Sequence, residues 1–177
     1  MIDTERLILR PWCKGDCEPF WAMACDPRVM AYLPPLTRAD SDEAVDRMIA
    51  IEREHGHAFW ALERKAEGDF IGFCGILPPR PPIFEYEIGW RLAQNAWGHG
   101  YAREAAEASL AWAWENLSVP AIMAITNIAN TRSWGLMERL GMIRYPDEDF
   151  DHPELAEGDP LRPHILYRIH RPSHAAV

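Results

Sequence analysis

Two glycines near the middle of the chain, Gly98 and Gly100, are spaced so that the backbone around them could bind phosphate. Between an apolar strand-like stretch and an Ala-rich helical stretch, they occupy the segment Asn95-Ala96-Trp97-Gly98-His99-Gly100-Tyr101-Ala102. A helix begins with unpaired N–H groups and the positive end of its dipole, and both attract anions. Because the glycines have no side chains, a phosphate could approach these amides. The segment therefore predicts a polyphosphate site built mainly from main-chain N–H groups.

Two common phosphate-binding motifs do not fit this segment. A P-loop ends in Gly-Lys-Ser/Thr, and no lysine lies near this turn. A dinucleotide-binding motif needs a small residue where Arg103 stands, within a parallel βαβ unit. Here the two preceding strand-like segments, 70–76 and 84–92, are joined by a Pro-rich connection and look antiparallel. The sequence therefore indicates a different kind of phosphate site.

Two carboxylates precede this site on the predicted strand. Glu85 and Glu87 alternate with Tyr86 and Ile88, so we expect them to share one face. A carboxylate that faces a cleft can take a proton from an ammonium group, directly or through water, and partial burial would raise its pKa. A solvated strand face would give the same alternation. Both interpretations are open from the pattern alone.

The elements that must position these residues follow from the periodicity of apolar residues. Asp40 with Glu43 predicts a capping box at the start of the second helix. Strands that are mostly antiparallel, covered by helices, make an α+β sandwich. We expect one domain over residues 1–177, with 172–177 as a frayed tail. The predicted helices are 14–25, 41–54, 100–116 and 131–141, and the predicted strands are 4–10, 57–62, 70–76, 86–92, 122–126, 142–145 and 165–169.

The glycine segment resembles the pyrophosphate loop of the GCN5-related N-acetyltransferases (GNAT), whose pattern is Gln/Arg-x-x-Gly-x-Gly/Ala; Asn95 departs from its first position. The block Asn130-Thr131-Arg132-Ser133-Trp134-Gly135-Leu136-Met137-Glu138-Arg139-Leu140-Gly141-Met142 resembles the family's later Asn-x-x-Ser…Leu-Gly-Phe/Met block. The opening Thr4-Glu5-Arg6-Leu7-Ile8-Leu9-Arg10 and the closing His164-Ile165-Leu166-Tyr167 resemble the RimJ/RimL-like branch of ribosomal-protein N-acetyltransferases. These blocks span nearly the whole chain.

The resemblance implies a GNAT-like three-layer sandwich, with a central, mostly antiparallel mixed sheet and a splayed strand pair that holds acetyl-CoA. Glu87 stands where family members often carry a general base, and Ser133 resembles the serine near the sulfur, a proton donor to the leaving thiolate. Leu92 N–H would polarise the thioester carbonyl. Trp90, Arg91 and Leu92 would bind the pantetheine arm through their free backbone groups. The other implied cofactor-binding residues are Asn95, Gly98, His99, Gly100, Tyr101, Ala102, Arg103, Asn130 and Ser133.

Several of these assignments have alternatives. Ser133 shares a helix stripe with apolar residues and should point inward, but a serine at a helix start also commonly binds backbone amides. Asn130 would cap the same helix, bind the pantetheine amides, or do both. Many family members use a tyrosine as the acid, and here only Tyr145 and Tyr167 are distant candidates. Three aromatic residues of the first third would either wall an acceptor pocket or pack in the core: Trp12, Trp21 and Tyr32.

Composition limits the classes of function. The chain has 177 residues, nearly half of them hydrophobic, and a net charge of −9, which argues against general nucleic-acid binding. It has no run of about 18 apolar residues, so we expect no membrane span. The start MIDTERLILR does not fit a signal peptide. The four cysteines form no CxxC pair, and the histidines have no metal-site spacing, so we expect a metal-free cytoplasmic protein.

The predicted activity is therefore direct, acetyl-CoA-dependent transfer of an acetyl group to a primary amine. The RimJ/RimL resemblance implies the α-amine of a protein N-terminus as the acceptor. A small amine, including an antibiotic, is the alternative within the enzyme class. A non-catalytic CoA-binding or sensing module and a structural dimer subunit with a vestigial pocket are alternatives outside it. Family members are often dimers, so the resemblance also implies a homodimer as one assembly.

Overall fold

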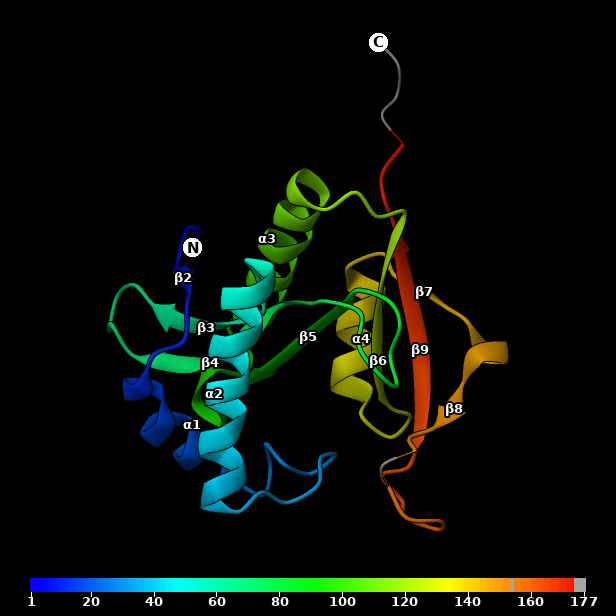
Figure 1. Ribbon diagram of the computed structural model, residues 1–177, viewed down its shortest axis with the longest axis horizontal. Helices are drawn as coiled ribbons and strands as arrows, with labels where there is room; N and C mark the ends of the chain where they lie inside the picture. The colour runs from blue at the N-terminus through cyan, green and yellow to red at the C-terminus, as the bar shows by residue number, and fades with distance from the viewer. Residues whose placement is uncertain (154, 174–177) are drawn as a thin grey trace.

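A nine-stranded mixed sheet with four α-helices forms the computed structural model, which describes residues 1–153 and 155–173 (Figure 1). The strand order is β1-β2-β3-β4-β5-β6-β9-β7, and β8 pairs with the outer part of β9. The helices are α1 (Cys17–Ala24), α2 (Arg38–His55), α3 (Tyr101–Asn116) and α4 (Thr131–Arg139). The strands are β1 (Ile2–Asp3), β2 (Leu7–Arg10), β3 (Phe59–Arg64), β4 (Phe70–Leu77), β5 (Glu87–Leu92), β6 (Ala121–Asn127), β7 (Ile143–Arg144), β8 (Phe150–Asp151) and β9 (Pro163–His170).

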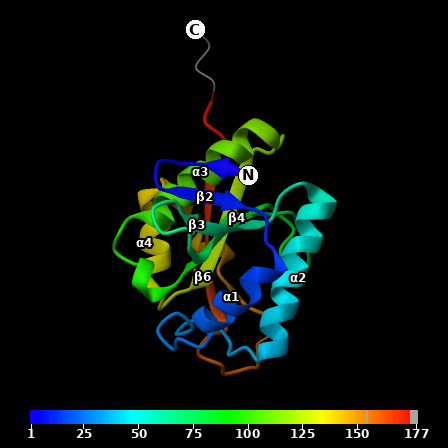
Figure 2. The same cartoon turned by 90° about the vertical axis from the view of Figure 1, so that its left-hand side faces the viewer.

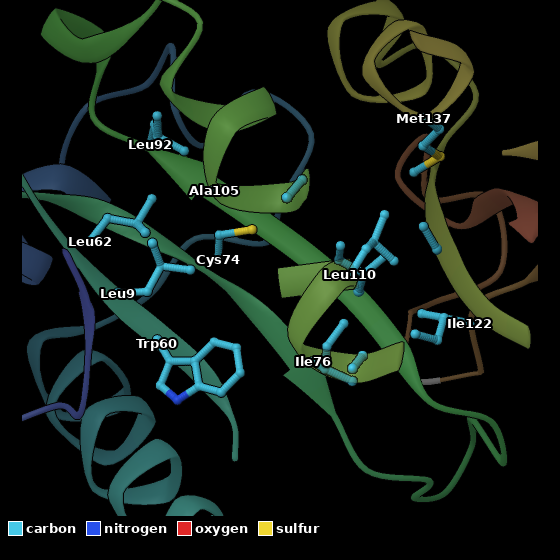
Figure 3. Packing of buried hydrophobic residues seen from close by; sticks show 14 of the residues in the cluster. Leu9, Trp60, Leu62, Cys74, Ile76, Leu92, Ala105, Leu110, Ile122 and Met137 are labelled. Carbon is cyan, nitrogen blue, oxygen red and sulfur yellow. The ribbon is translucent and has the colours of Figure 1, made fainter. Parts of the chain in front are cut away.

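Helices cover both faces of the sheet, and β3 and β4 contribute apolar side chains to a core on each face (Figure 2). On β3, Trp60 and Leu62 join the core under α3, whereas Ala61 joins the core under α1 and α2. Figure 3 shows Trp60, Leu62, Cys74 and Ile76 packed beneath α3. The result is the predicted three-layer α+β sandwich.

Small residues let α3 lie close to the sheet. Ala105, Ala106 and Ala113 are fully buried on the face that meets β4 and β5. Ser109 on the same face donates a hydrogen bond from Oγ to the carbonyl of Ala105 at 2.7 Å, which satisfies its buried hydroxyl. This close packing fixes the position of the first turn of α3 beside the end of β5.

The sheet is split between β5 and β6, which among the described strands are the one parallel pair. Their ladder consists of a single register pair, Glu87 with Met123, supported by a hydrogen bond from Met123 N–H to the carbonyl of Tyr86 at 2.9 Å. Beyond this pair the strands diverge, as Figure 1 shows. β5 remains paired with β4 as far as Leu92, and β6 remains paired with β9 as far as Asn127. The splayed strand pair that the family resemblance implied is present.

The start of α2, the opening of the first helix and two short strands differ from the sequence prediction. The capping box of α2 uses Thr37 and Asp40, so the helix begins at Arg38, three residues before the predicted start. The first helix opens as a 3-10 turn over Lys14–Asp16. Two short strands, β1 and β8, were not predicted, and β8 lies between the predicted strands 142–145 and 165–169. Residues 174–177 of the predicted frayed tail lie outside the described residues.

Within residues 1–153 and 155–173, no helix combines the length and apolar character that crossing a bilayer requires.

Candidate active site

A cleft of about 890 Å³ lies where β5 and β6 diverge. Most of its lining comes from three parts of the chain: the carboxyl end of β5 with the start of α3, the carboxyl end of β6 with the start of α4, and the segment between α1 and α2. Phe73 of β4, His152 after β8 and His164 of β9 complete it. Among the described lining residues, Glu87 is the one acidic side chain. The arginines of the cleft are Arg28, Arg91, Arg103, Arg132 and Arg139.

The loop that enters α3 presents free amides to this cleft. Gly98 and Gly100 both have a left-handed backbone, with φ of 79° and 82°, which glycine adopts without steric cost. Gly100 is the N-cap of α3 and provides no side-chain cap. The first N–H to bond back is that of Glu104, to the carbonyl of Gly100 at 3.1 Å. Within the described residues, the N–H groups of Tyr101, Ala102 and Arg103 are thus left for a ligand.

The turn between β1 and β2 tethers this loop. Arg6 donates from Nη1 to the carbonyl of His99 at 2.9 Å and forms an ion pair with Glu104 at 2.6 Å. Thr4 donates from Oγ1 to the same carboxylate at 2.6 Å. Burial tends to raise the pKa of Glu104, but these hydrogen bonds outweigh that effect and lower it. A network of side chains from β1–β2 and α3 therefore fixes the loop.

Of the two predicted carboxylates, only Glu87 lies in the cleft. Glu87 is 9% exposed, and its carboxylate accepts a hydrogen bond from Nη2 of Arg80 at 2.6 Å. Glu85 precedes β5 and forms an ion pair with Arg168 of β9 at 2.5 Å. That pair borders a separate cavity of about 400 Å³. The two glutamates therefore belong to different sites.

Ser133 and Asn130 border the cleft from the start of α4. Asn130 caps the helix by accepting a hydrogen bond from the N–H of Ser133 at 3.3 Å, and its Nδ2 donates to Oγ1 of Thr126 at 3.1 Å. The hydroxyl of Ser133 makes no hydrogen bond to any residue that the structure describes. Leu136 and Met137, on the same stripe, are buried. Ser133 Oγ is thus available to a ligand in the cleft.

The end of β5 contributes side chains to both faces. Trp90 and Leu92 pack toward the core under α3, and the carbonyl of Leu92 accepts a hydrogen bond from Trp97 Nε1 at 2.8 Å. Arg91 lies between them and points to the opposite face, where its guanidinium sits 5.3 Å from the ring of Phe73. Phe73 is its register partner on β4. Burial lowers the pKa of Arg91 to about 10.

The structure does not bring every predicted residue to the cleft. Asn95 and His99 are exposed and are not among its lining residues. Trp12 is buried beside Phe20 in the core under α1 and α2, and Trp21 does not line the cleft either, whereas Tyr32 does. The remaining candidates, Tyr145 and Tyr167, bind His170 and Glu138 and lie outside the cleft. Burial raises the pKa of Tyr167.

Sequence reasoning missed several residues of the site. Arg80 lies in the Pro-rich connection, which has no periodic pattern, so nothing in the sequence indicated its contact with Glu87. Thr126 and Asn127 end β6 and line the cleft because β6 is the facing strand of the split. Their position directly before Asn130 was the signal that could have indicated them. The segment between α1 and α2 contributes Arg28, Val29, Tyr32 and Leu33.

Comparison with known proteins finds a family model and relatives that match this chain. A family model described as an acetyltransferase (GNAT) domain matches residues 6–143. The uncharacterised protein YkkB of Bacillus subtilis is 33% identical over 144 residues, which cover 78% of this chain and 83% of YkkB.

Solved structures of acetyltransferases have the same fold. An acetyltransferase from Agrobacterium tumefaciens superposes with a TM-score of 0.78 at 29% identity, over 96% of this chain and 93% of its own. A spermidine N-acetyltransferase from Vibrio cholerae, solved with CoA and spermine, superposes with a TM-score of 0.72 at 17% identity, over 93% of this chain and 95% of its own. The second likeness is one of fold alone.

Proposed function

The chain belongs to the GNAT family of acetyltransferases, and from this premise we propose that it transfers an acetyl group from acetyl-CoA directly to a primary amine. The observation that carries the proposal is the split between β5 and β6, which opens at Glu87 and ends beside the free amides of α3. One continuous cleft thus joins an anion-binding loop, a buried carboxylate and a free hydroxyl. These are the groups that acyl transfer to an amine requires.

The residues of the cleft fit CoA. The N–H groups of Tyr101, Ala102 and Arg103 would bind its pyrophosphate, because these residues line the cleft, their N–H groups have no partner among the described residues, and they lie at the positive end of α3. The free edge of β5 at Trp90–Leu92 would pair with the pantetheine arm. Acetyl-CoA supplies the activated acetyl group as a thioester. Holding it beside the amine makes the transfer effectively intramolecular.

Two side chains would move protons. Glu87 takes a proton from the acceptor ammonium, directly or through water, so that the neutral amine can attack the thioester carbonyl. Ser133 Oγ gives its proton to the departing thiolate and takes in exchange the proton that the attacking nitrogen loses as the amide forms. Glu87 and Ser133 line opposite walls of the same cleft, on β5 and α4. No covalent acyl-enzyme is needed in this scheme, since the amine attacks directly.

The α-amine of a peptide is the acceptor class that the RimJ/RimL-like sequence blocks favour. Small amines are the second class, because a family relative in fold is named for acetylating spermidine. A cytoplasmic location and a homodimer stay predictions.

Calorimetry with acetyl-CoA, followed by release of free thiol with a panel of amines and N-terminal peptides, tests the proposal. We expect micromolar binding and thiol release that depends on one class of acceptor. Binding without release from any acceptor would favour a CoA-sensing module instead. Absence of binding would contradict the assignment of the cleft to CoA.

A further inference from the structure

Arg91 differs from every other arginine of the cleft. Arg28, Arg103, Arg132 and Arg139 are exposed to solvent, and Arg28 and Arg103 form ion pairs with Asp26 and Glu107. Arg91 is partly exposed as a residue, but its guanidinium is buried, and among the described residues it has no carboxylate partner. Its one hydrogen bond runs from Nη1 to Met30 Sδ at 3.8 Å, and sulfur is a weak acceptor.

A buried guanidinium with no anion is costly to the folded protein. An arginine carries five N–H donors in a fixed fork, and it remains charged at neutral pH. The ring of Phe73 satisfies one face of the guanidinium, but it accepts no hydrogen bond in the plane of the fork. The donors of Arg91 therefore point into a cleft that lacks a protein carboxylate for them within the described residues.

The side chain does not face the predicted CoA site. Trp90 and Leu92 point to the side of α3, whose first turn carries the free amides. By the alternation of a strand, Arg91 points to the opposite side, where it meets Phe73 and the segment between α1 and α2. The CoA phosphates and the Arg91 guanidinium would thus lie on different faces of β5.

Arg91 and the proposed base share a face of the same strand. Glu87, Gly89 and Arg91 alternate with Ile88 and Trp90, so the carboxylate and the guanidinium border one surface. The ring of Phe59 packs over Gly89 between them, 2.5 Å from where a Cβ would lie, so the surface that joins Glu87 to Arg91 is an aromatic one. A substrate that presents its amine to Glu87 would therefore extend along β5 toward Arg91.

We propose that Arg91 binds a carboxylate of the amine acceptor, so that the enzyme selects acceptors that carry an acidic group. This proposal rests on the proposed acetyltransferase function and names its substrate class. A carboxylate matches the fork of the guanidinium in a bidentate pair. Glu87 and Arg91 are four residues apart, or about 13 Å along the strand. The amine and the carboxylate are therefore several bonds apart, as in a short peptide.

Matched acceptors test the proposal. We would measure kcat/KM with Ala-Ala-Ala as its free acid and as its C-terminal amide, and with Ala-Ala-Glu-amide and Ala-Ala-Gln-amide. The wild type should prefer the acid of each pair by at least about tenfold, the size expected for a charge-assisted pair. Arg91→Met keeps an apolar stem of similar length, and in this variant the preference should disappear while acetyl-CoA binding stays the same.

A matched control is Arg38→Met, which removes an exposed arginine of α2 outside the cleft. It should keep the full preference. Equal rates for acid and amide in the wild type, or an Arg91→Met variant that loses acetyl-CoA affinity instead of acceptor preference, would overturn the proposal.

A binding measurement separates this proposal from the function on which it rests. Calorimetry of the CoA complex with N-acetyl-Ala-Ala-Ala, as acid and as amide, needs no turnover. Tighter binding of the acid by the wild type but not by Arg91→Met supports the Arg91 assignment even if no tested amine is acetylated. If the wild type binds the acid no more tightly than the amide, or if Arg91→Met keeps the wild type's preference for the acid, the Arg91 assignment is refuted. This holds even where thiol release proves the acetyltransferase.

Discussion

The carboxylate of Glu87 accepts a hydrogen bond from Nη2 of Arg80 at 2.6 Å, and this contact joins the Pro-rich β4–β5 connection to the first residue of β5. The guanidinium approaches from outside the cleft, since Arg80 is not one of its lining residues. Arg80 therefore orients the carboxylate, while the cleft leaves the other side of Glu87 open to a substrate.

Glu87→Gln tests the proposed base. The amide keeps the size of the side chain but cannot take a proton, so kcat should fall by about 100-fold or more, the usual contribution of a general base. The affinity for acetyl-CoA in calorimetry should not change. Glu85→Gln is the matched control, because Glu85 pairs with Arg168 outside the cleft. Full turnover in Glu87→Gln would remove Glu87 from the mechanism.

Arg80→Met tests the role of Arg80 as a positioning residue. Without the guanidinium the carboxylate loses its fixed orientation, and kcat should fall by roughly 10- to 100-fold. The KM and Kd for acetyl-CoA should stay near the wild-type values, and Arg80→Lys should restore part of kcat. A purely structural role would instead lower the melting temperature, and Arg80→Lys would not rescue kcat.

Gly98→Trp tests the phosphate loop. Nothing lies within 4 Å of a Cβ at Gly98, so the side chain fits but fills the space beside the free amides. Acetyl-CoA binding should be lost. Gly68→Trp is the control, because Gly68 also has positive φ and open surroundings but lies in the turn between β3 and β4. If both variants bind acetyl-CoA like the wild type, the pyrophosphate lies elsewhere.

Glu104→Gln tests the tether of the loop through its pH dependence. The pKa of Glu104 in the folded protein is lower than its usual 4.5, so its carboxylate stabilises the fold above that pH. The stabilisation is lost as the pH falls through the lowered value. At neutral pH the variant should be less stable by about 1–3 kcal/mol, because hydrogen bonds to a charged group are lost. Thermal unfolding should show this difference shrink well below pH 4.5. A difference that is constant with pH would contradict the charge-based account.

Arg91→Met should stabilise the protein. Removing a buried, unpaired charge abolishes a desolvation cost, and methionine can keep a sulfur–aromatic contact with Phe73. We expect a gain of about 0.5–2 kcal/mol, or a melting temperature higher by about 2–4 °C for each kcal/mol. A lower melting temperature would mean that the guanidinium has a partner that stabilises the fold.

The periodicity of apolar residues was sufficient to predict the order of the main helices and strands and the start of α3, because each depends on residues close together in the chain. Gly98 and Gly100 precede an apolar helical stripe, and both take the left-handed backbone that only glycine adopts freely. The capping box of α2 was assigned three residues late, since Thr37-Arg38-Ala39-Asp40 and Asp40-Ser41-Asp42-Glu43 both fit the pattern.

Long-range contacts could not be predicted in the same way. The partner of Glu87 comes from an irregular Pro-rich segment, and the partner of Glu85 comes from β9, more than 80 residues later in the chain. Arg91 was predicted only as a main-chain contact. Its unusual environment depends on Phe73 and Met30, which the sequence does not place beside it.

The single β5–β6 pair also determines how the cleft could move. Among the described strands, backbone pairing joins the halves of the sheet, β1–β5 and β6–β9, only at Glu87 and Met123. A rotation about this pivot displaces each residue in proportion to its distance from it. Leu92 lies five residues away, about 17 Å, so a rotation of about 10° would move it by roughly 3 Å while Glu87 stays almost still. The far end of the cleft can therefore widen to admit a cofactor without disturbing the group that accepts the proton.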